Sequence, residues 1–402
     1  MNELRASGIA RRRAEEERAE APFSSTSDDD GGGSQARCAS SSEEGPSQFS
    51  RVLVARLDSL GDVLLAGPAV RAVAASAKVT MLVREGLDEA AEMLPGVDDV
   101  MQFDAPWVLF DPPPVRPHAI ADLVAEVEAR CFDAALVLTS FHQSPLPLAL
   151  LLRMAKVPWI GAICEDYPGS LLDLRHRVPD GLPESERGLS LATAAGFVAD
   201  EQGARLAVRR PLPDVTHRVG TEPYVIFHPG AAVPARRPTA VHSRAMVAAL
   251  LAAGHRVVVT GSADEATLTG LVASTGSAGM PAVDLGGRLS LPELAAVLAG
   301  AEVVVVPNTG PAHLAAAVGT PVVSLFAPVV PARQWAPYGV PRVLLGDQQA
   351  ACRNTRMRTC SVPDHPCLSS IDPGEVVAAV AELRVHRKTD AAKVVTKGGL
   401  AM

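Results

Sequence analysis

Residues 303–326 read VVVVPNTGPAHLAAAVGTPVVSLF, and this stretch decides the fold. A run of four valines ends in a polar turn with two prolines, residues 312–318 favour a helix, and a second apolar run follows at residues 322–326. Uniformly apolar runs joined through a helix are typical of a buried parallel sheet. The stretch therefore predicts a strand–helix–strand unit of an α/β fold. Its polar turn lies at the carboxyl end of a strand, where open α/β sheets bind their ligands.

The polar turn carries the groups that an anion site uses. Asn308, Thr309, Gly310 and Pro311 precede the expected helix, and His313 lies in its first turn. Free backbone N–H groups at a helix N-terminus, with a hydroxyl and an imidazole nearby, suit a phosphate. The alternative is that Asn308 and Thr309 only cap the helix and that His313 is a hydrogen-bonded core histidine. We prefer ligand contact, because the turn follows a strand and is flanked by two prolines.

The composition indicates a protein with a large core and no nucleic-acid partner. Of 402 residues, 48% are hydrophobic and 20% are charged, and the net charge of −8 argues against a nucleic-acid-binding surface. The sequence has no uninterrupted apolar run of about 18 residues and no signal-peptide core. We therefore expect a cytoplasmic protein, with peripheral contact at the inner membrane surface as the one membrane association compatible with this pattern.

Strand and helix patterns divide the chain into four segments. Residues 1–50 are rich in Ser, Glu, Asp, Gly and Arg and have little to bury, which predicts a disordered tail. Two α/β series follow at residues 51–213 and 222–383, joined by a proline-rich linker. Residues 384–402 are polar and basic and are expected to form a flexible tail. Two α/β domains of similar size predict a ligand cleft between them.

The first candidate catalytic residue follows the first expected strand, residues 52–55. Asp62 lies after Gly61 in the turn at the carboxyl end of that strand, so its carboxylate is expected to face the cleft. There it is suited to act as general base on a hydroxyl nucleophile. The alternative, which spacing alone favours, is an ordinary aspartate of a turn or helix cap. Asp58, in the same turn, is the weaker candidate.

A second candidate site follows the first strand of the second series. The loop at residues 229–238 combines small residues with Arg236 and Arg237. Two arginines can hold a diphosphate through bidentate hydrogen bonds. A solvated loop with surface arginines explains the same sequence equally well.

The sequence gives little support for a metal or a cofactor. Cys352, Cys360 and Cys367, with His365 between the last two, lack a C-x-x-C pair, so free thiols are preferred over a zinc site. No GxGxxG follows the first strand, no GxxxxGKS/T occurs, and Asp-x-Asp occurs only at residues 28–30. We therefore expect no cofactor and no metal, and leaving-group charge offset by arginines and a helix N-terminus.

Together the motifs resemble glycosyltransferase family 9, the heptosyltransferase family. The matching stretches are RLDSLGDVLL (residues 56–65), HPGA (228–231), PARR (234–237), TGPAHLAAA (309–317) and GTPVVSLFAP (319–328), with the late Cys-rich segment. They occur in the family's order. The resemblance implies a GT-B fold, in which two Rossmann-like domains face each other across a cleft, with the acceptor mainly on the first and the sugar nucleotide mainly on the second.

The resemblance also implies an activity. It implies metal-independent, inverting transfer of heptose or a related sugar from a nucleoside-diphosphate sugar such as ADP-heptose. The acceptor would be a hydroxyl of a glycan or lipid-linked molecule in cell-envelope polysaccharide biosynthesis. Asp62 falls on the family's proposed base, Arg236 where the family usually has a diphosphate-binding lysine, and Glu265 near its ribose contact.

One departure from the family pattern lies in the central turn. Thr309, Gly310 and His313 fall on the family's phosphate- and sugar-contacting turn, but Asn308 stands where the family usually has an aspartate that contacts the donor sugar. An amide can still hydrogen-bond sugar hydroxyls, so only the donor identity is left open. The alternatives are a sugar-nucleotide epimerase of GT-B fold and a non-catalytic sugar-nucleotide-binding module. Asp62 argues against the module, since a binder has no need of a base.

Overall fold

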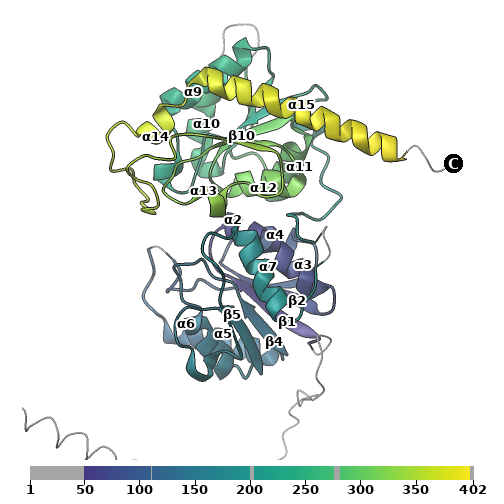
Figure 1. Ribbon diagram of the computed structural model, residues 1–402, viewed down its shortest axis with the longest axis vertical. Helices are drawn as coiled ribbons and strands as arrows, with labels where there is room; N and C mark the ends of the chain where they lie inside the picture. The colour runs from purple at the N-terminus through teal and green to yellow at the C-terminus, as the bar shows by residue number, and fades with distance from the viewer. Residues whose placement is uncertain (1–48, 110, 200–202, 276–280, 399–402) are drawn as a thin grey trace, which may run out of the picture. The chain divides into compact units, whose positions relative to one another are not determined.

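A computed structural model of the protein describes residues 49–109, 111–199, 203–275 and 281–398, with side chains as far as Val385 (Figure 1). Two parallel sheets, each with six strands, carry the fold of these residues. The expected N-terminal tail at residues 1–50 lies outside the described residues, except for its last two.

The first sheet has the strand order β3-β2-β1-β4-β5-β6. Its strands are β1 (Arg51–Arg56), β2 (Lys78–Val83), β3 (Val97–Gln102), β4 (Ala134–Val137), β5 (Trp159–Ile163) and β6 (Leu174–His176). Its helices are α2 (Leu60–Leu65), α3 (Gly67–Ala74), α4 (Asp88–Glu92), α5 (Pro117–Ala129), α6 (Leu146–Met154), the 3-10 turn η1 (Gly169–Leu171) and α7 (Glu184–Ala194). After Arg51, every residue of the central strand β1 is buried, as expected for a strand covered on both faces.

The second sheet has the strand order β12-β11-β10-β7-β8-β9. Its strands are β7 (Val225–Phe227), β8 (Val257–Val259), β9 (Val283–Asp284), β10 (Val303–Pro307), β11 (Val322–Leu325) and β12 (Arg342–Leu345). Its helices are α8 (Thr216–Val219), η2 (Pro234–Arg236), α9 (Ala240–Ala252), η3 (Ala263–Glu265), α10 (Ala266–Ala273), α11 (Leu291–Gly300), α12 (Gly310–Val318), α13 (Ala332–Trp335), α14 (Pro366–Ser369) and α15 (Pro373–Gly398). The stretch at residues 303–326 forms the predicted unit, because β10 pairs in parallel with β11 and α12 connects them.

Both sheets have the same topology. Numbered from its own first strand, each reads 3-2-1-4-5-6 or its mirror listing, which is the order of a Rossmann sheet. The direction of winding reverses between β1 and β4 in the first sheet and between β7 and β10 in the second. The predicted fold class, two Rossmann-like halves in one α/β chain, is confirmed.

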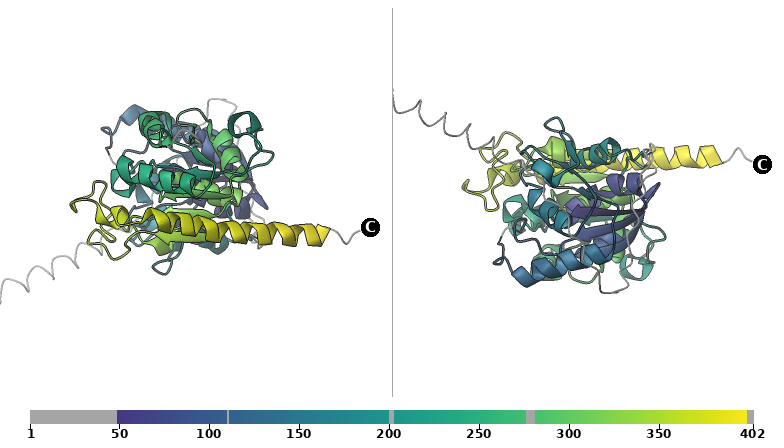
Figure 2. Two further views of the ribbon diagram at one scale, coloured as in Figure 1. Left: turned by 90° about the horizontal axis from the view of Figure 1, so that it is seen from above. Right: turned by 90° about the horizontal axis from the view of Figure 1, so that it is seen from below.

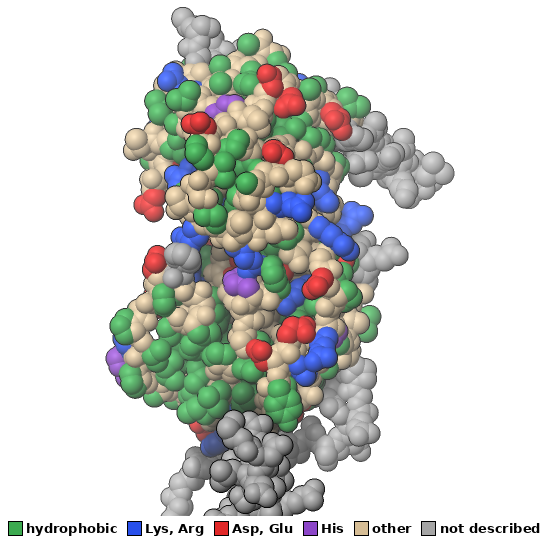
Figure 3. All heavy atoms as spheres, turned by 60° about the vertical axis from the view of Figure 1, so that its left-hand side comes forward, with side chains coloured by type: hydrophobic (Ala, Val, Ile, Leu, Met, Phe, Trp, Pro, Cys, Tyr) green, Lys and Arg blue, Asp and Glu red, His purple; other side chains and the backbone are tan. Residues whose placement is uncertain are grey.

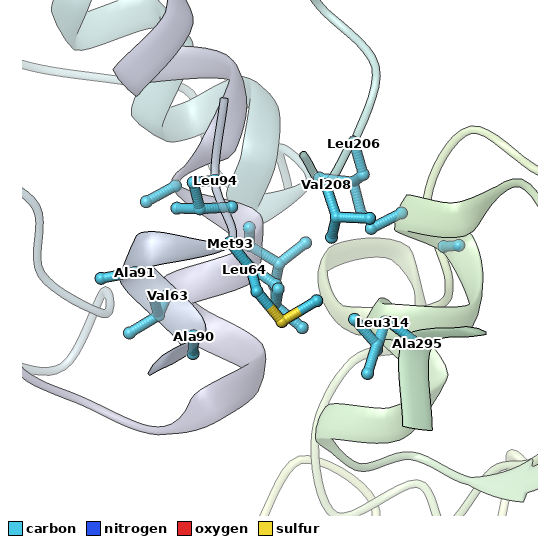
Figure 4. Close-up of a cluster of buried hydrophobic side chains, with 14 of the residues drawn as sticks. Val63, Leu64, Ala90, Ala91, Met93, Leu94, Leu206, Val208, Ala295 and Leu314 are labelled. Atoms are coloured by element: carbon cyan, nitrogen blue, oxygen red, sulfur yellow. The ribbon is translucent and has the colours of Figure 1, made fainter. Parts of the chain in front are cut away.

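Apolar side chains join the two halves. Ser42–Met402 form one compact unit, and one buried cluster runs from the helices beside the first sheet to those beside the second. In Figure 4, Leu64 and Met93 of the first half point towards Leu314 and Ala295 of the second. Burying a leucine or methionine side chain contributes about 1.5–3 kcal/mol. This contact fixes α2 against α12, the two helices that carry the candidate site.

Two helices differ from the sequence prediction. The long helix α15 continues to Gly398, past residue 384, where a flexible tail was expected (Figures 1 and 2). Residues 384–397 contain neither glycine nor proline, so nothing in the sequence interrupts the helix before Gly398. The expected turn at residues 56–62 ends in α2, so Asp62 lies in the first turn of a helix. No helix in the described ranges is both long and apolar enough to cross a bilayer.

Candidate functional site

The predicted site residues follow one strand of the first sheet and three adjacent strands of the second, close to the two points where the winding reverses. Asp58, Gly61 and Asp62 follow β1, Arg236 and Arg237 follow β7, Glu265 follows β8, and Asn308, Thr309, Gly310, Pro311 and His313 follow β10. Ligands of open α/β sheets bind at such reversal points. The site therefore has a first-sheet half and a second-sheet half.

The first-sheet half is built on Arg56, the buried last residue of β1, to which the sequence interpretation gave no role. Its Nη2 donates to Asp62 Oδ1 at 2.7 Å and to Ser140 Oγ at 3.1 Å. Its Nε lies 3.0 Å from Asp58 Oδ2. One guanidinium thus holds both aspartates that the sequence singled out.

Asp62 is buried and ionised. Its Oδ2 accepts hydrogen bonds from the Ser59 N–H at 3.0 Å and the Ser59 hydroxyl at 2.6 Å. Burial alone would raise the pKa of Asp62, but the Arg56 charge and the Ser59 hydrogen bonds outweigh it and hold the pKa below its ordinary value. A carboxylate has about four lone-pair positions, so Oδ1, with one donor, keeps room for a hydroxyl. Oδ2 thus caps the helix, as the alternative interpretation of Asp62 expects. The role of Asp62 as a general base, through Oδ1, stays a prediction.

Asp58 differs electrostatically from Asp62 although both contact Arg56. Burial raises the pKa of Asp58 to about 6, with Arg56 opposing the shift and Asp62 adding to it. The Gln143 amide donates to its Oδ1 at 2.5 Å. Two carboxylates with pKa values pushed apart are typical of sites that move protons.

Glu184 and Arg187 on α7 complete this cluster and were missed by sequence reasoning. Glu184 Oε2 lies 3.5 Å from Arg56 Nη2 and 3.7 Å from Arg187 Nη1. Arg187 also donates to the Thr139 carbonyl oxygen, next to β4. The two residues stand three apart on one helix, more than a hundred residues from Arg56 in the sequence. No local motif points to them.

The second-sheet half is centred on the N-terminus of α12. Gly310 and Pro311 are its first two residues, and Thr309 precedes them without a side-chain capping bond. His313 is 5% exposed, and its Nδ1 has no hydrogen-bond partner among the described residues. Burial lowers the pKa of His313 to about 4, so its imidazole is neutral at pH 7. The alternative interpretation of this turn is therefore wrong on two points. The Thr309 side chain makes no capping hydrogen bond, and His313 Nδ1 is not hydrogen-bonded within the described residues.

Asn308, by contrast, has a hydrogen-bond partner in the fold for each polar atom of its side chain. Its Oδ1 accepts the Ala327 N–H at 3.3 Å, and its Nδ2 donates to the Ala327 carbonyl oxygen at 3.3 Å. The side chain is buried and ties the end of β10 to the residues after β11. Contact with a donor sugar remains a prediction for this residue.

Arg236 is half-buried, unlike the surface arginine of the alternative interpretation. Its Nη1 donates to the Asn308 carbonyl oxygen at 3.5 Å, and its buried Nε has no partner among the described residues. Burial lowers the pKa of Arg236; Asp62 opposes the shift, and Arg356 and Arg358 add to it. Arg237, also half-buried, follows it at the end of η2.

Glu265 lies over the loop that follows β7. Its Oε2 accepts the Ser262 N–H at 2.9 Å and lies 3.8 Å from His228 Nε2. A Cβ at Gly230 would lie 2.0 Å from a Glu265 carboxylate oxygen, so a larger residue there would push the Glu265 side chain aside. Burial lowers the pKa of His228 to about 4, although Glu265 opposes the shift.

Two glycines let the halves of the site meet. A Cβ at Gly61 would lie 2.8 Å from His313 Cδ2, and a Cβ at Gly310 would lie 2.8 Å from Leu60 Cδ2. The N-termini of α2 and α12 therefore approach closely enough for Asp62 to act on the pKa of His313, which it raises against the stronger effect of burial. On the face shown in Figure 3, basic and histidine side chains gather around a recess.

Cysteines and cavities elsewhere add no residue to this site. Cys352 and Cys367 are buried in the core beside the second sheet, and Cys360 is partly buried against it. Across the described residues, no three His, Cys, Asp or Glu side chains are grouped as a metal site requires. A cavity of about 860 Å³ lies along the linker between Arg210 and Tyr224 and is lined by none of the predicted site residues.

Similar proteins of known structure support the fold. A glycosyltransferase family 9 structure from Veillonella parvula matches with a TM-score of 0.69 and 17% identity, covering 86% of this chain and 100% of its own. The Escherichia coli ADP-heptose lps heptosyltransferase II matches with a TM-score of 0.64 and 20% identity, covering 84% and 99%. At these identities the likeness shows the fold alone, and it agrees with the expected GT-B class.

Sequence comparisons identify the family. Lipopolysaccharide heptosyltransferase 3 of Escherichia coli is 29% identical over 179 residues, which are 44% of this chain and 51% of that protein, so the chain spans about half the length of this relative. The model of glycosyltransferase family 9 (heptosyltransferase) matches residues 120–365. The match includes the whole second-sheet half of the site and leaves out Arg56 to Asp62. Because it covers more than half of the 402 residues, the chain belongs to glycosyltransferase family 9, the heptosyltransferase family.

Proposed function

We propose that the protein transfers a sugar from a nucleoside-diphosphate sugar to a hydroxyl of a glycan or lipid-linked acceptor. One observation carries the proposal. An ionised, buried carboxylate (Asp62) stands beside a set of cationic and hydrogen-bonding groups that lack an anion (Arg236, His313 and the N-terminus of α12). A base next to an anion site is what transfer of a sugar from a diphosphate requires.

The anion site is suited to the diphosphate of the donor. Arg236 has no carboxylate partner among the described residues, and a guanidinium binds phosphate oxygens in pairs. The first N–H groups of α12 and the neutral His313 ring supply further hydrogen bonds. We assign Glu265, which follows β8, to the ribose. The name of the Escherichia coli structure supports ADP-heptose as the donor.

Asp62 supplies the base. Its Oδ1 takes the proton of the acceptor hydroxyl, whose oxygen bonds to the anomeric carbon from the face opposite the diphosphate. The bond from that carbon to the diphosphate oxygen breaks, the nucleoside diphosphate leaves with the electron pair, and the anomeric configuration is inverted. The transition state has oxocarbenium character, so fixed charges contribute most to catalysis. Arg236, Arg237 and α12 offset the leaving-group charge, and this scheme needs no metal ion.

The proposal also assigns the two domains and the cellular site of the reaction. We place the acceptor-side domain at residues 51–213 and the donor-side domain at residues 222–383. For a lipid-linked acceptor of cell-envelope biosynthesis, the protein would work in the cytoplasm, at the inner membrane surface. Leu150 and Met154, one turn apart on α6, are 49% and 56% exposed and would suit such a contact.

The transfer reaction tests this function. Wild-type protein is incubated with ADP-heptose and a cell-envelope glycolipid extract, and ADP release and sugar incorporation are measured. Asp62→Asn should lower turnover by about 10²–10⁴-fold, the usual contribution of a general base, with nucleotide affinity kept. Asp122→Asn, at an exposed position on α5, is the matched control.

Three other outcomes would contradict this mechanism or this function. Full turnover by Asp62→Asn would remove Asp62 from the mechanism. A change of the donor sugar without any acceptor would indicate an epimerase. Nucleotide binding without release of ADP from any donor would indicate a binding module.

A further inference from the structure

Arg356 is a second-half residue that contacts a loop of the first half, next to Ser140 of the Arg56 cluster. It belongs to the loop between β12 and α14. Its guanidinium carbon lies 3.6 Å from the centroid of the Phe141 ring, in the loop after β4. Its backbone N–H donates to the Val329 carbonyl oxygen at 2.8 Å, which fixes the residue to the second half. The side chain thus reaches the loop after β4, while the backbone is held by the loop after β11.

Arg356 and Arg236 lie on neighbouring segments of the second half, because the Ala235 N–H donates to the Arg358 carbonyl oxygen at 2.8 Å. None of the ion pairs among the described residues includes either of them. Both are half-buried, and Arg356 is near enough to help lower the pKa of Arg236. The acids that act on their pKa values, Asp62 on Arg236 and Glu184 on Arg356, are already bound to Arg56.

Two buried polar atoms of the second-sheet half offer hydrogen-bonding positions to a ligand. Arg236 Nε and His313 Nδ1 are both buried without a hydrogen-bond partner among the described residues. Leaving a buried donor unsatisfied costs about as much as a lost hydrogen bond. A group with several anionic oxygens would satisfy the donors and both charges at once.

We propose that Arg356 acts with Arg236 to bind a phosphate group of a substrate and helps to determine which substrate is accepted. The proposal rests on the proposed function, which offers two sources of that group. One is the diphosphate of the donor; the other is a phosphate carried by the acceptor, which the position of Arg356 over Phe141 would allow. A planar guanidinium held over an aromatic ring presents its donors in a fixed direction.

Calorimetric titration of the full chain tests the proposal in two arms. The first arm measures the affinity for ADP and for inorganic pyrophosphate; the second measures the affinity of ADP-saturated protein for inorganic phosphate. Arg356→Ala should weaken binding about 10- to 100-fold in at least one arm, as expected for lost charge-assisted hydrogen bonds. Arg353→Ala, on an exposed arginine of the same loop bonded to Gln349, should stay within about two-fold.

Two further variants keep the test valid if Arg356→Ala folds poorly. Phe141→Leu removes the ring but leaves the arginine, and should weaken binding about two- to five-fold. Arg356→Lys keeps the charge but loses the bidentate geometry, so its loss should lie between those of Phe141→Leu and Arg356→Ala. Thermal unfolding of each variant identifies any that has lost its fold.

The outcomes separate the sources and the two proposals. Loss in the first arm assigns the phosphate to the donor, and loss confined to the second assigns it to the acceptor. Arg356-dependent binding of pyrophosphate or phosphate without any binding of ADP supports the phosphate site and argues against the proposed function. Unchanged affinities in both arms, or no binding of any phosphate probe by the wild type, would overturn the proposal and leave Arg356 as a contact between the halves.

Discussion

Asn308 shows how the fold can fix a residue at the edge of a site. Its amide pairs with both backbone groups of Ala327, with its oxygen accepting the N–H and its nitrogen donating to the carbonyl oxygen. An aspartate would keep the first bond, but its second oxygen would face the Ala327 carbonyl oxygen in a buried place. The asparagine that departs from the family's usual residue therefore matches the backbone of its own chain.

Asn308→Asp is accordingly expected to destabilise the protein by about 1–3 kcal/mol at pH 7, the usual cost of an unsatisfied buried polar group. Urea unfolding measures the difference. Asn354→Asp, at an exposed asparagine of the loop before α14, should change stability by no more than about 0.5 kcal/mol. Equal stability of Asn308→Asp and wild type would show that the amide is not held as described.

At this scale the sequence predicts individual candidates better than their partners. Asp62, Arg236 and His313 stand out because each follows a strand end in a short motif. Arg56 also lies at a strand end, but nothing in the sequence shows that it forms ion pairs with two buried aspartates. Glu184 reaches Arg56 only through the packing of α7 against α3 and α2, and distant pairs of this kind become visible only in the folded chain.

The helices α2 and α12 are the elements that assemble the site. Their N-termini meet through Gly61 and Gly310, at distances that exclude a methyl group. The buried His313 ring lies directly against Gly61 and has little room to move. The sequence places both glycines in conspicuous motifs, yet their close contact depends on how the two sheets pack. Helix α15 was missed beyond residue 384, because charged composition alone does not separate an exposed helix from a tail.

Gly61→Ala should therefore displace the His313 ring. We expect a loss of stability of about 1–3 kcal/mol from overpacking and nucleoside-diphosphate affinity weakened about ten-fold. Gly67→Ala, in the next helix, is the matched control, because a Cβ there would lie no closer than 3.5 Å to its neighbours. It should be neutral or slightly stabilising. Wild-type affinity in Gly61→Ala would show that His313 takes no part in the nucleotide site.

At the scale of the whole molecule, two Rossmann-type sheets share one topology. Helix α2 follows β1 at the reversal point of the first sheet, and α12 follows β10 at that of the second. Valine runs and strand–helix alternation predict this architecture well, because parallel strands buried on both faces leave a strong sequence signal. Which half binds which substrate leaves no such signal. Only the folded chain shows the carboxylate cluster after β1 and, after β7 and β10, the Arg236 guanidinium and the neutral His313 ring on which the proposed division between acceptor and donor rests.

A thermal-shift panel of nucleoside diphosphates and sugar nucleotides, on wild type and Arg236→Ala, tests the central claim most directly. Stabilisation of the wild type by one nucleotide at concentrations well above its Kd should raise the unfolding free energy by about 2.7 kcal/mol at a hundred-fold excess. The same nucleotide should stabilise Arg236→Ala much less, because the diphosphate loses its guanidinium. No stabilisation of the wild type by any nucleotide, or equal stabilisation of the two proteins, would contradict a donor site built on Arg236.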